Sequence, residues 1–206
     1  LMACGSGKST SDSGSGDSKA EVSSQTGENA KKKIGVLQYV QHPALDKANE
    51  GFVAALKEAG VDVDIEQENA GGEQSAAQTI ANKLVNDKKD LILAIATPAA
   101  QAAAGATSDI PVVITAVTDP ADSGLVESND KPGGNVTGSS DLTPVADQIE
   151  LLTKILPDAK NVGILYCTAE ANSKLQAGLA MDALKAKGLN GVEYTVSSSN
   201  EIQSVV

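Results

Sequence analysis

The chain has 206 residues with 27 acidic and 16 basic side chains, which gives a formal net charge of −11 at pH 7. This acidity argues against nucleic acid or an anionic membrane surface as the partner, since both carry negative charge themselves. Two cysteines and one histidine cannot form a Cys/His zinc site by themselves. No apolar run reaches the roughly 18 residues of a membrane span. We therefore expect no metal, no cofactor and no membrane-spanning segment.

The first residues are typical of a processed bacterial protein. Leu1 to Gly5 resembles the end of a lipoprotein signal peptide, in which the cysteine, here Cys4, carries the lipid. The alternative is a chance cysteine near the start. Residues 5–33 are rich in Ser and Gly and too polar to build a core, so we expect a disordered tether. Residues 1–4 would then be the end of the signal peptide with the lipidated cysteine. We therefore expect a palmitate-bearing protein anchored to the outer side of a bacterial cell membrane, with a Gram-positive source favoured.

From Ile34 onward, apolar runs of strand length alternate with apolar residues at helical spacing. Thr97 and Thr143, each followed by proline, are interpreted as helix N-caps. The predicted strands are 34–39, 61–66, 91–96, 111–117, 136–140, 162–166 and 192–196. The predicted helices are 45–59, 77–85, a segment from Thr97, 143–156 and 175–184.

Repeated strand–helix units with nearly continuous apolar strands predict an α/β fold, in which parallel sheets carry helices on both faces. A stretch rich in Pro and Gly, residues 119–134, interrupts the alternation, and we place a change of domain at about residues 140–143. The expected organisation is a first α/β lobe at 34–142 and the beginning of a second lobe, incomplete in this chain, at 143–206.

Ligands of open α/β sheets bind beyond the carboxyl ends of the strands. Polar or aromatic residues follow the predicted strands at Gln38, Tyr39, Thr97, Thr118, Asp119, Ser140, Asp141, Cys167, Thr168 and Glu170. We interpret this set as a binding cleft; the alternative is that the threonines only cap helices and the aspartates only stabilise loops. Cys167 is expected to be a packed residue rather than a nucleophile. Asp119 and Asp141 could form an acid/base pair, but nothing suggests a substrate for them, so no enzymatic activity is expected.

Several blocks in the same order along the chain resemble the ABC-transporter substrate-binding lipoproteins of the tryptophan or aromatic amino-acid type. They are Gln41–Asp46 (QHPALD), Ala94–Gln101 (AIATPAAQ), Thr115–Pro120 (TAVTDP), Lys131–Gly138 (KPGGNVTG) and Glu170–Ser173 (EANS). The resemblance implies a type I periplasmic-binding-protein fold whose two lobes close on a small ligand. It also implies an extracytoplasmic lipoprotein that delivers an amino acid to a membrane permease without chemistry of its own. We expect this protein to be a monomer.

The family's ligand contacts, carried over by position, fall on both lobes. In the first lobe they are Tyr39, His42, Thr97, Pro98, Ala99, Thr118, Asp119, Ser140 and Asp141, and in the second lobe Glu170, Ala171, Asn172 and Ser173. Amides at a helix N-terminus suit a carboxylate, and Asp141 is expected to hold the α-ammonium group. Cys167-Thr168 departs from the Asn-Pro that the family more often has there. The alternatives are a sensory ligand-binding module on the same fold and an extracellular enzyme.

Overall fold

The computed structural model describes residues 31–205, except the side chain of Ser199. Cys4 and the expected tether up to residue 30 lie outside the described residues, so their roles stay predictions. The tether was expected to reach residue 33, which is wrong, because Lys32 and Lys33 open strand β1 (Lys32–Gln38). Asp90 holds both, since its carboxylate accepts from Lys32 Nζ at 2.7 Å and from the Lys33 backbone N–H at 2.8 Å. None of the helices in this described part is long and apolar enough to cross a bilayer.

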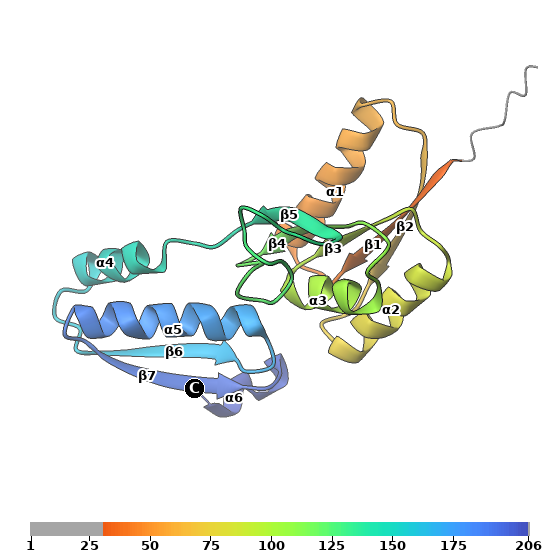
Figure 1. The fold of residues 1–206 in the computed structure, drawn as a ribbon. Helices are drawn as coiled ribbons and strands as arrows, with labels where there is room; N and C mark the ends of the chain where they lie inside the picture. The colour runs from red at the N-terminus through yellow and green to blue at the C-terminus, as the bar shows by residue number, and fades with distance from the viewer. Residues whose placement is uncertain (1–30, 206) are drawn as a thin grey trace, which may run out of the picture. The chain divides into compact units, whose positions relative to one another are not determined.

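Five parallel strands form the first sheet, in the order β2-β1-β3-β4-β5 (Figure 1). Its other strands are β2 (Val63–Asn69), β3 (Leu91–Ile95), β4 (Val112–Val117) and β5 (Val136–Ser140). The helices that connect them are α1 (Pro43–Glu58), α2 (Gln74–Asn86) and α3 (Thr97–Ala106). Parallel neighbours require crossover connections, and three of the four contain a helix, which confirms the alternation predicted from the sequence; the connection from β4 to β5, residues 118–135, contains none.

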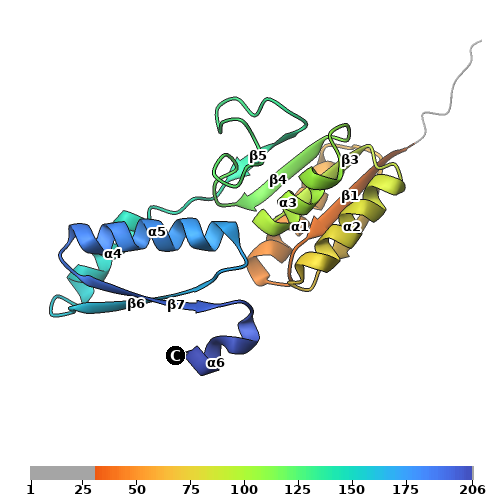
Figure 2. The ribbon, with the colours of Figure 1, turned by 60° about the horizontal axis from the view of Figure 1, so that its bottom comes forward.

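The two faces of this sheet are covered by different helices (Figures 1 and 2). Successive residues of a strand point to opposite faces. On β1, Val36 therefore packs with α1, whereas the next residue, Leu37, packs with α2 and α3. The alanine-rich α3 buries most of its residues, which lets it lie close to the sheet. Both faces of the central strands are apolar for this reason.

A second sheet contains two parallel strands, β6 (Asn161–Cys167) and β7 (Asn190–Val196). Two helices, α4 (Val145–Ile155) and α5 (Ala171–Ala186), accompany it, and Leu184 of α5 is fully buried among them. A short 3-10 turn, η1 (Ser199–Glu201), leads into α6 (Ile202–Val205) (Figure 2). The alternating exposure along β6 shows that only one face of this sheet is well covered.

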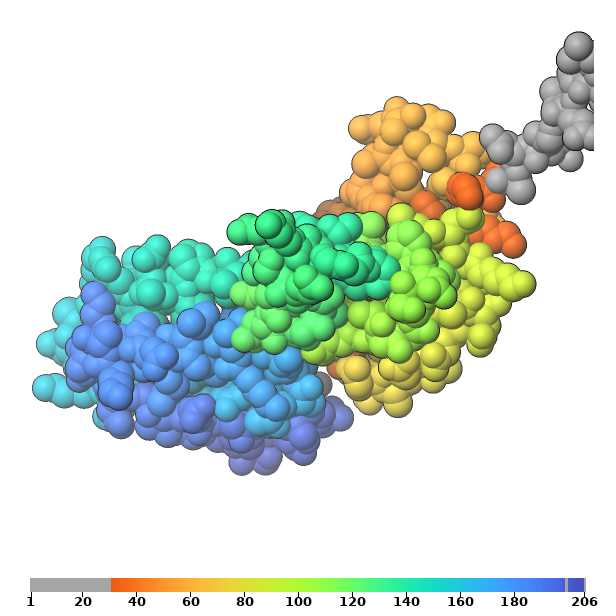
Figure 3. Space-filling view, viewed as in Figure 1, coloured from red at the N-terminus to blue at the C-terminus, as the bar shows by residue number. Residues whose placement is uncertain are grey.

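Apolar side chains reach the surface around the second sheet. Leu151 and Ile155 of α4 are 56% and 66% exposed, and Tyr194 of β7 is 40% exposed. The outer faces of α4 (teal) and α5 (blue) both lie at the surface in Figure 3. The first sheet contrasts with this, because its central strands are nearly inaccessible to water.

The helix starts differ from those predicted. The N-cap of α3 is Ala96, with φ 84°, so Thr97 is the first helical residue and does not cap the helix. The N-cap of α4 is Pro144, without a side-chain cap hydrogen bond, so the prediction for Thr143 is also wrong. Helices α2 and α5 begin earlier than predicted because apolar spacing marks only the buried turns, and no residue of α2 before Ala77 or of α5 before Ala177 is fully buried.

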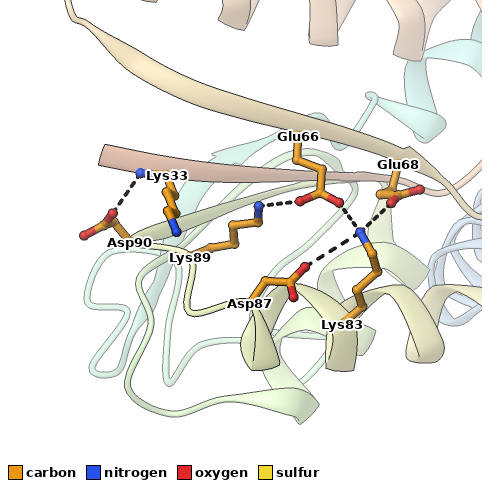
Figure 4. A network of polar contacts seen from close by, with 7 residues as sticks. All are labelled: Lys33, Glu66, Glu68, Lys83, Asp87, Lys89 and Asp90. Atoms are coloured by element: carbon orange, nitrogen blue, oxygen red, sulfur yellow. Dashed lines mark hydrogen bonds and ion pairs between the residues drawn. The ribbon is translucent and has the colours of Figure 1, made fainter. Parts of the chain in front are cut away.

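An ion-pair network joins β2 to α2 and the turn that follows it (Figure 4). The Glu66 carboxylate accepts hydrogen bonds from Lys83 and Lys89, and Lys83 Nζ also donates to Glu68 at 2.8 Å. The hydrogen bonds from Lys83 and Lys89 lower the pKa of Glu66 to about 2. The Lys89 side chain is only 7% exposed, so this network includes a buried cation.

Candidate ligand-binding site

A cavity of about 910 Å³ lies where strands of both sheets end. Parallel strands present their carboxyl ends at one edge, so the connections after β1, β2 and β3 meet there. From the first sheet the lining residues are Tyr39, Val40, Leu45, Gly71, Gly72, Glu73, Gln74, Ala96 and Pro98. From α4, the second sheet, α5 and α6 they include Val145, Gln148, Tyr166, Cys167, Ala169, Glu170, Asn172, Ser173, Val196, Ser197 and Ile202.

Tyr39 provides an aromatic wall directly after β1. It is 9% exposed, and its hydroxyl donates to the Gly72 carbonyl at 2.8 Å. Burial raises the pKa of the Tyr39 phenol, and the negative charge of Glu170 raises it further. The phenol therefore stays protonated and keeps donating to Gly72, which ties the connection after β1 to the connection after β2.

A buried polar cluster fixes the backbone on either side of Tyr39. Gln38 is 3% exposed, and its Nε2 donates to the Val40 carbonyl at 2.9 Å and to Asp46 Oδ1 at 2.6 Å. Asn49 Nδ2 in turn donates to Gln38 Oε1 at 3.3 Å. Sequence reasoning missed Asp46 and Asn49, although their spacing places both on the face of α1 that meets the strand.

The β3–α3 junction has a strained backbone at the edge of the cavity. Ala96 has φ 84°, a region that costs a non-glycine residue about 1–3 kcal/mol. Its N–H donates to the Thr115 carbonyl at 3.0 Å, which holds it in that conformation. Thr97 is 1% exposed, and its buried Oγ1 has no hydrogen-bond partner. The strain and the unpartnered hydroxyl lie together at the start of α3, whose Pro98 lines the cavity.

The start of α5 brings three polar residues into the cavity lining. Glu170 is the N-cap of α5, and Ser173 Oγ donates to its Oε2 at 3.4 Å. Asn172 has a buried Oδ1 with no hydrogen-bond partner. Cys167, a free half-buried thiol, lies 3.5 Å from the Ser197 carbonyl through its Sγ. This part of the wall carries a carboxylate, an amide, a hydroxyl and a thiol.

Charge in the lining is of one sign. Glu73 and Glu170 are the charged side chains among the lining residues, which include no lysine, arginine or histidine. Within residues 31–205, no three His, Cys, Asp or Glu side chains lie close enough to hold a metal ion. The cavity is therefore suited to an uncharged or cationic group near the carboxylates.

Five of the residues predicted to contact a ligand lie in this lining: Tyr39, Pro98, Glu170, Asn172 and Ser173. The others lie outside it: His42, Thr97, Ala99, Thr118, Asp119, Ser140, Asp141 and Ala171. Their part in binding stays a prediction. The sequence reasoning missed Gly71, Gly72 and Glu73, which follow β2, because that strand was expected to end at residue 66. The Gly-Gly pair after an alternating run was the available signal.

Several of the outlying residues have local partners instead. His42 is the N-cap of α1, and its Nδ1 accepts from the Ala44 N–H at 3.2 Å. Asp119 Oδ1 accepts from Asn129 Nδ2 and from the Ala121 and Asp122 N–H groups, which lower its pKa. Ser140 Oγ donates to the Thr118 carbonyl at 2.7 Å.

Asp141 is exposed, and its backbone N–H donates to the Val117 carbonyl at 3.0 Å. The carboxylate of Asp141 is not the cap of α4, because that helix has no side-chain cap hydrogen bond. The expectation that Asp141 holds the ammonium group of a ligand stays a prediction.

The family model described as "ABC transporter substrate binding protein" matches residues 33–206. A tyrosine-binding protein of Clostridioides difficile (strain R20291) is 43% identical over 195 residues, which are 93% of this chain and 56% of that protein. The chain thus spans about half the length of that relative.

Two solved structures are similar in both sequence and fold. The ABC domain from Streptococcus pneumonia in complex with L-Trp has a TM-score of 0.82 and 43% identity, over 85% of this chain and 61% of that one. A conserved domain protein from Vibrio cholerae has a TM-score of 0.83 and 39% identity, over 85% of this chain and 60% of that one. These matches confirm the predicted fold class, the two-lobed α/β fold of type I periplasmic binding proteins, with about three fifths of their length present in this chain.

Proposed function

Because the chain belongs to the family of ABC transporter substrate binding proteins, we propose that it captures an amino acid, with an aromatic one favoured, and delivers it to a membrane permease. The observation that carries the proposal is the cavity lined from both sheets, with Tyr39 on one side and the start of α5 on the other. The relatives named for tyrosine and for L-Trp, both 43% identical, favour an aromatic ligand.

We propose that the two sheets with their helices are the two lobes, divided near residues 140–143, and that the ligand lies between them. Contacts from both sides are what a small ligand needs to lose most of its water-accessible surface. Tyr39 would supply the aromatic wall, and Glu170, Asn172 and Ser173 the polar contacts. The remaining predicted contacts, His42, Thr97, Ala99, Thr118, Asp119, Ser140, Asp141 and Ala171, would require movement of the lobes to reach the ligand.

The proposed activity is binding without a reaction. Capture and release require no nucleophile, base or cofactor, and the polar residues of the lining are suited to hydrogen bonding a ligand. Cys167 would then serve as a small wall residue.

We further propose that the protein is a monomer on the outer side of the membrane, held by a lipid on Cys4 with the Ser- and Gly-rich segment as its tether. Cys4→Ser in the expressed precursor should move the protein from the membrane fraction to the soluble fraction. Cys167→Ser is the matched control, and it should leave the membrane fraction unchanged. Membrane retention of the Cys4→Ser protein would contradict the lipid anchor.

The function is tested by a thermal-shift screen of this chain against the protein amino acids. A ligand present at 100 times its dissociation constant stabilises the folded state by about 2.7 kcal/mol. We expect L-tyrosine or L-tryptophan to raise the melting temperature and acidic amino acids to leave it unchanged. An equal response to all amino acids, or none, would contradict the proposal.

A further inference from the structure

Two aromatic side chains line the cavity, and they come from different sheets. The chain has three tyrosines, one phenylalanine and no tryptophan. Tyr39 directly follows β1 of the first sheet, and Tyr166 lies near the carboxyl end of β6 in the second sheet. Phe52 packs between α1 and the first sheet, and neither Phe52 nor Tyr194 lines the cavity.

Resting on the proposed function, we propose that Tyr166 is a second aromatic wall of the cavity and determines its preference for aromatic over aliphatic amino acids. The sequence did not single out Tyr166 as a ligand contact. The ring of the ligand would lie between Tyr39 and Tyr166. Aromatic rings in offset or edge-to-face arrangements are stabilised beyond the area that they bury. An aliphatic side chain gains the burial without this additional stabilisation.

The register of the second sheet places the Tyr166 side chain on the face that α5 covers (Figure 1). Successive residues of a strand point to opposite faces. Ile164, two residues before Tyr166, packs with α4 and α5. On β7, a side chain at Gly191 would meet Leu184 of α5, so Glu193, two residues later, also faces this helix. Tyr166 and Glu193 therefore share the face on which α5 lies.

The hydroxyl of Tyr166 already has a partner on that face. It donates to Glu193 Oε1 at 3.0 Å. This hydrogen bond raises the pKa of the Tyr166 phenol, so the phenol stays protonated at neutral pH. The hydroxyl of Tyr39 likewise donates to the Gly72 carbonyl at 2.8 Å. Hydrogen bonds within the protein therefore orient both rings, and the rings rather than free hydroxyls are left for a ligand.

The residues that follow Tyr166 lie near Tyr39. Burial raises the pKa of the Tyr39 phenol, and Glu170 and Cys167 raise it further. Cys167 is the next residue after Tyr166, and all four of these residues line the same cavity. The two aromatic walls therefore border one space, in which a single ligand could contact both.

The Tyr166 ring is not fully covered by the helix above it. Tyr166 is only half-buried, although α5 lies over its face of the sheet. The residues of α5 that line the cavity after its first turn include Ala177 and Ala180, whose side chains are small. A larger residue of α5 at these positions would cover more of the ring, so the small ones favour access from the cavity.

Isothermal titration calorimetry with L-tyrosine, L-tryptophan and L-leucine tests the proposal. Tyr166→Leu keeps an apolar side chain but removes the ring, so it should weaken binding of both aromatic amino acids by about tenfold. L-leucine should stay within about twofold of its affinity for the parent chain. Tyr166→Phe keeps the ring and loses only the hydrogen bond to Glu193, so L-tyrosine should stay within about threefold.

Tyr194→Leu is the matched control, because it makes the same change in the same sheet. The ring of Tyr194 lies over Gly163 on the other face and outside the cavity lining. This variant should leave the affinities for all three amino acids within about twofold. An unchanged affinity of Tyr166→Leu for the aromatic amino acids would overturn the proposal. An equal loss for L-leucine would also overturn it, because Tyr166 would then only support the fold.

A comparison on the parent chain needs no variant. L-phenylalanine and L-cyclohexylalanine have rings of similar size, but only the first is aromatic. Aromatic walls predict tighter binding of L-phenylalanine by about threefold or more, although the saturated ring is the more hydrophobic one. Equal or tighter binding of L-cyclohexylalanine would overturn the proposal.

The proposed function and this inference fail separately. Binding of L-tyrosine that Tyr166→Leu leaves intact would support the function and overturn the inference. Failure of the parent chain to bind any amino acid would overturn both.

Discussion

Glu66→Gln should destabilise the first sheet, because it leaves the buried Lys89 ammonium beside an uncharged side chain. Lys89 is 7% exposed and Glu66 32%, so the cation loses its partner in a place that water hardly reaches. Removing one member of a fully buried pair costs about 3–5 kcal/mol. Glutamine keeps an acceptor oxygen and the site is partly open, so we expect a loss of about 2 kcal/mol in the free energy of unfolding.

Urea unfolding at neutral pH measures this loss, and two further variants identify its origin. Lys83→Met removes a cation that is 47% exposed and should cost much less. The double variant Glu66→Gln with Lys89→Met removes the uncompensated charge and should recover stability relative to Glu66→Gln alone. Equal losses for Glu66→Gln and Lys83→Met, or no recovery in the double variant, would refute the reasoning.

The same network predicts a dependence on pH. The folded-state pKa of Glu66 is lowered to about 2 from its ordinary value of 4.5. Its contribution to stability is therefore fully present above pH 4.5 and is lost as the pH falls toward 2. The difference in stability between the parent and Glu66→Gln should be constant from neutral pH down to that upper value and shrink below it. A difference that shrinks already near neutral pH would contradict the assignment.

Three further predictions concern the cavity wall. Gln38→Leu removes the hydrogen bonds from Gln38 to Val40 and Asp46, which fix the backbone beside Tyr39. Calorimetry should therefore show L-tyrosine binding about tenfold more weakly. An unchanged affinity would show that Gln38 does not position Tyr39. Thr97→Val removes a buried hydroxyl without a partner, so the melting temperature should stay level or rise, and a clear fall would contradict that. In a Cys4→Ser background, L-tyrosine should slow the reaction of the Cys167 thiol with a disulfide reagent, since Cys167 lines the cavity; an unchanged rate would place the ligand elsewhere.

Much of the fold could be predicted from the sequence because buried parallel strands are continuous apolar runs. The segment Leu91–Ile95 is surrounded on both faces, and its composition shows it directly. Helix starts could not be read as well. A threonine followed by a proline fits an N-cap pattern, but the N-cap of α3 is Ala96, one residue before Thr97. The strained backbone of Ala96 is stabilised by a hydrogen bond from its N–H to the neighbouring strand β4.

The candidate site was predictable only in part, since polar residues at strand ends have two competing uses. Tyr39 and Glu170 point to the cavity, whereas Asp119 follows a strand just as directly and binds the N–H groups of its own loop. Which use applies depends on the path of the chain after the strand. Residues 119–134 have no periodic pattern from which that path could be inferred.

The central claim, that the cavity takes an aromatic amino acid, is tested most directly by the fluorescence of the ligand. The chain contains no tryptophan, so emission excited at the red edge of the tryptophan band comes from added L-tryptophan alone. Titration with this chain should shift that emission to shorter wavelength in a saturable, single-site manner, because the indole leaves water for an apolar wall. Excess L-tyrosine should reverse the shift. Emission that stays unchanged at saturating protein, or a shift that L-tyrosine cannot reverse, would contradict the account.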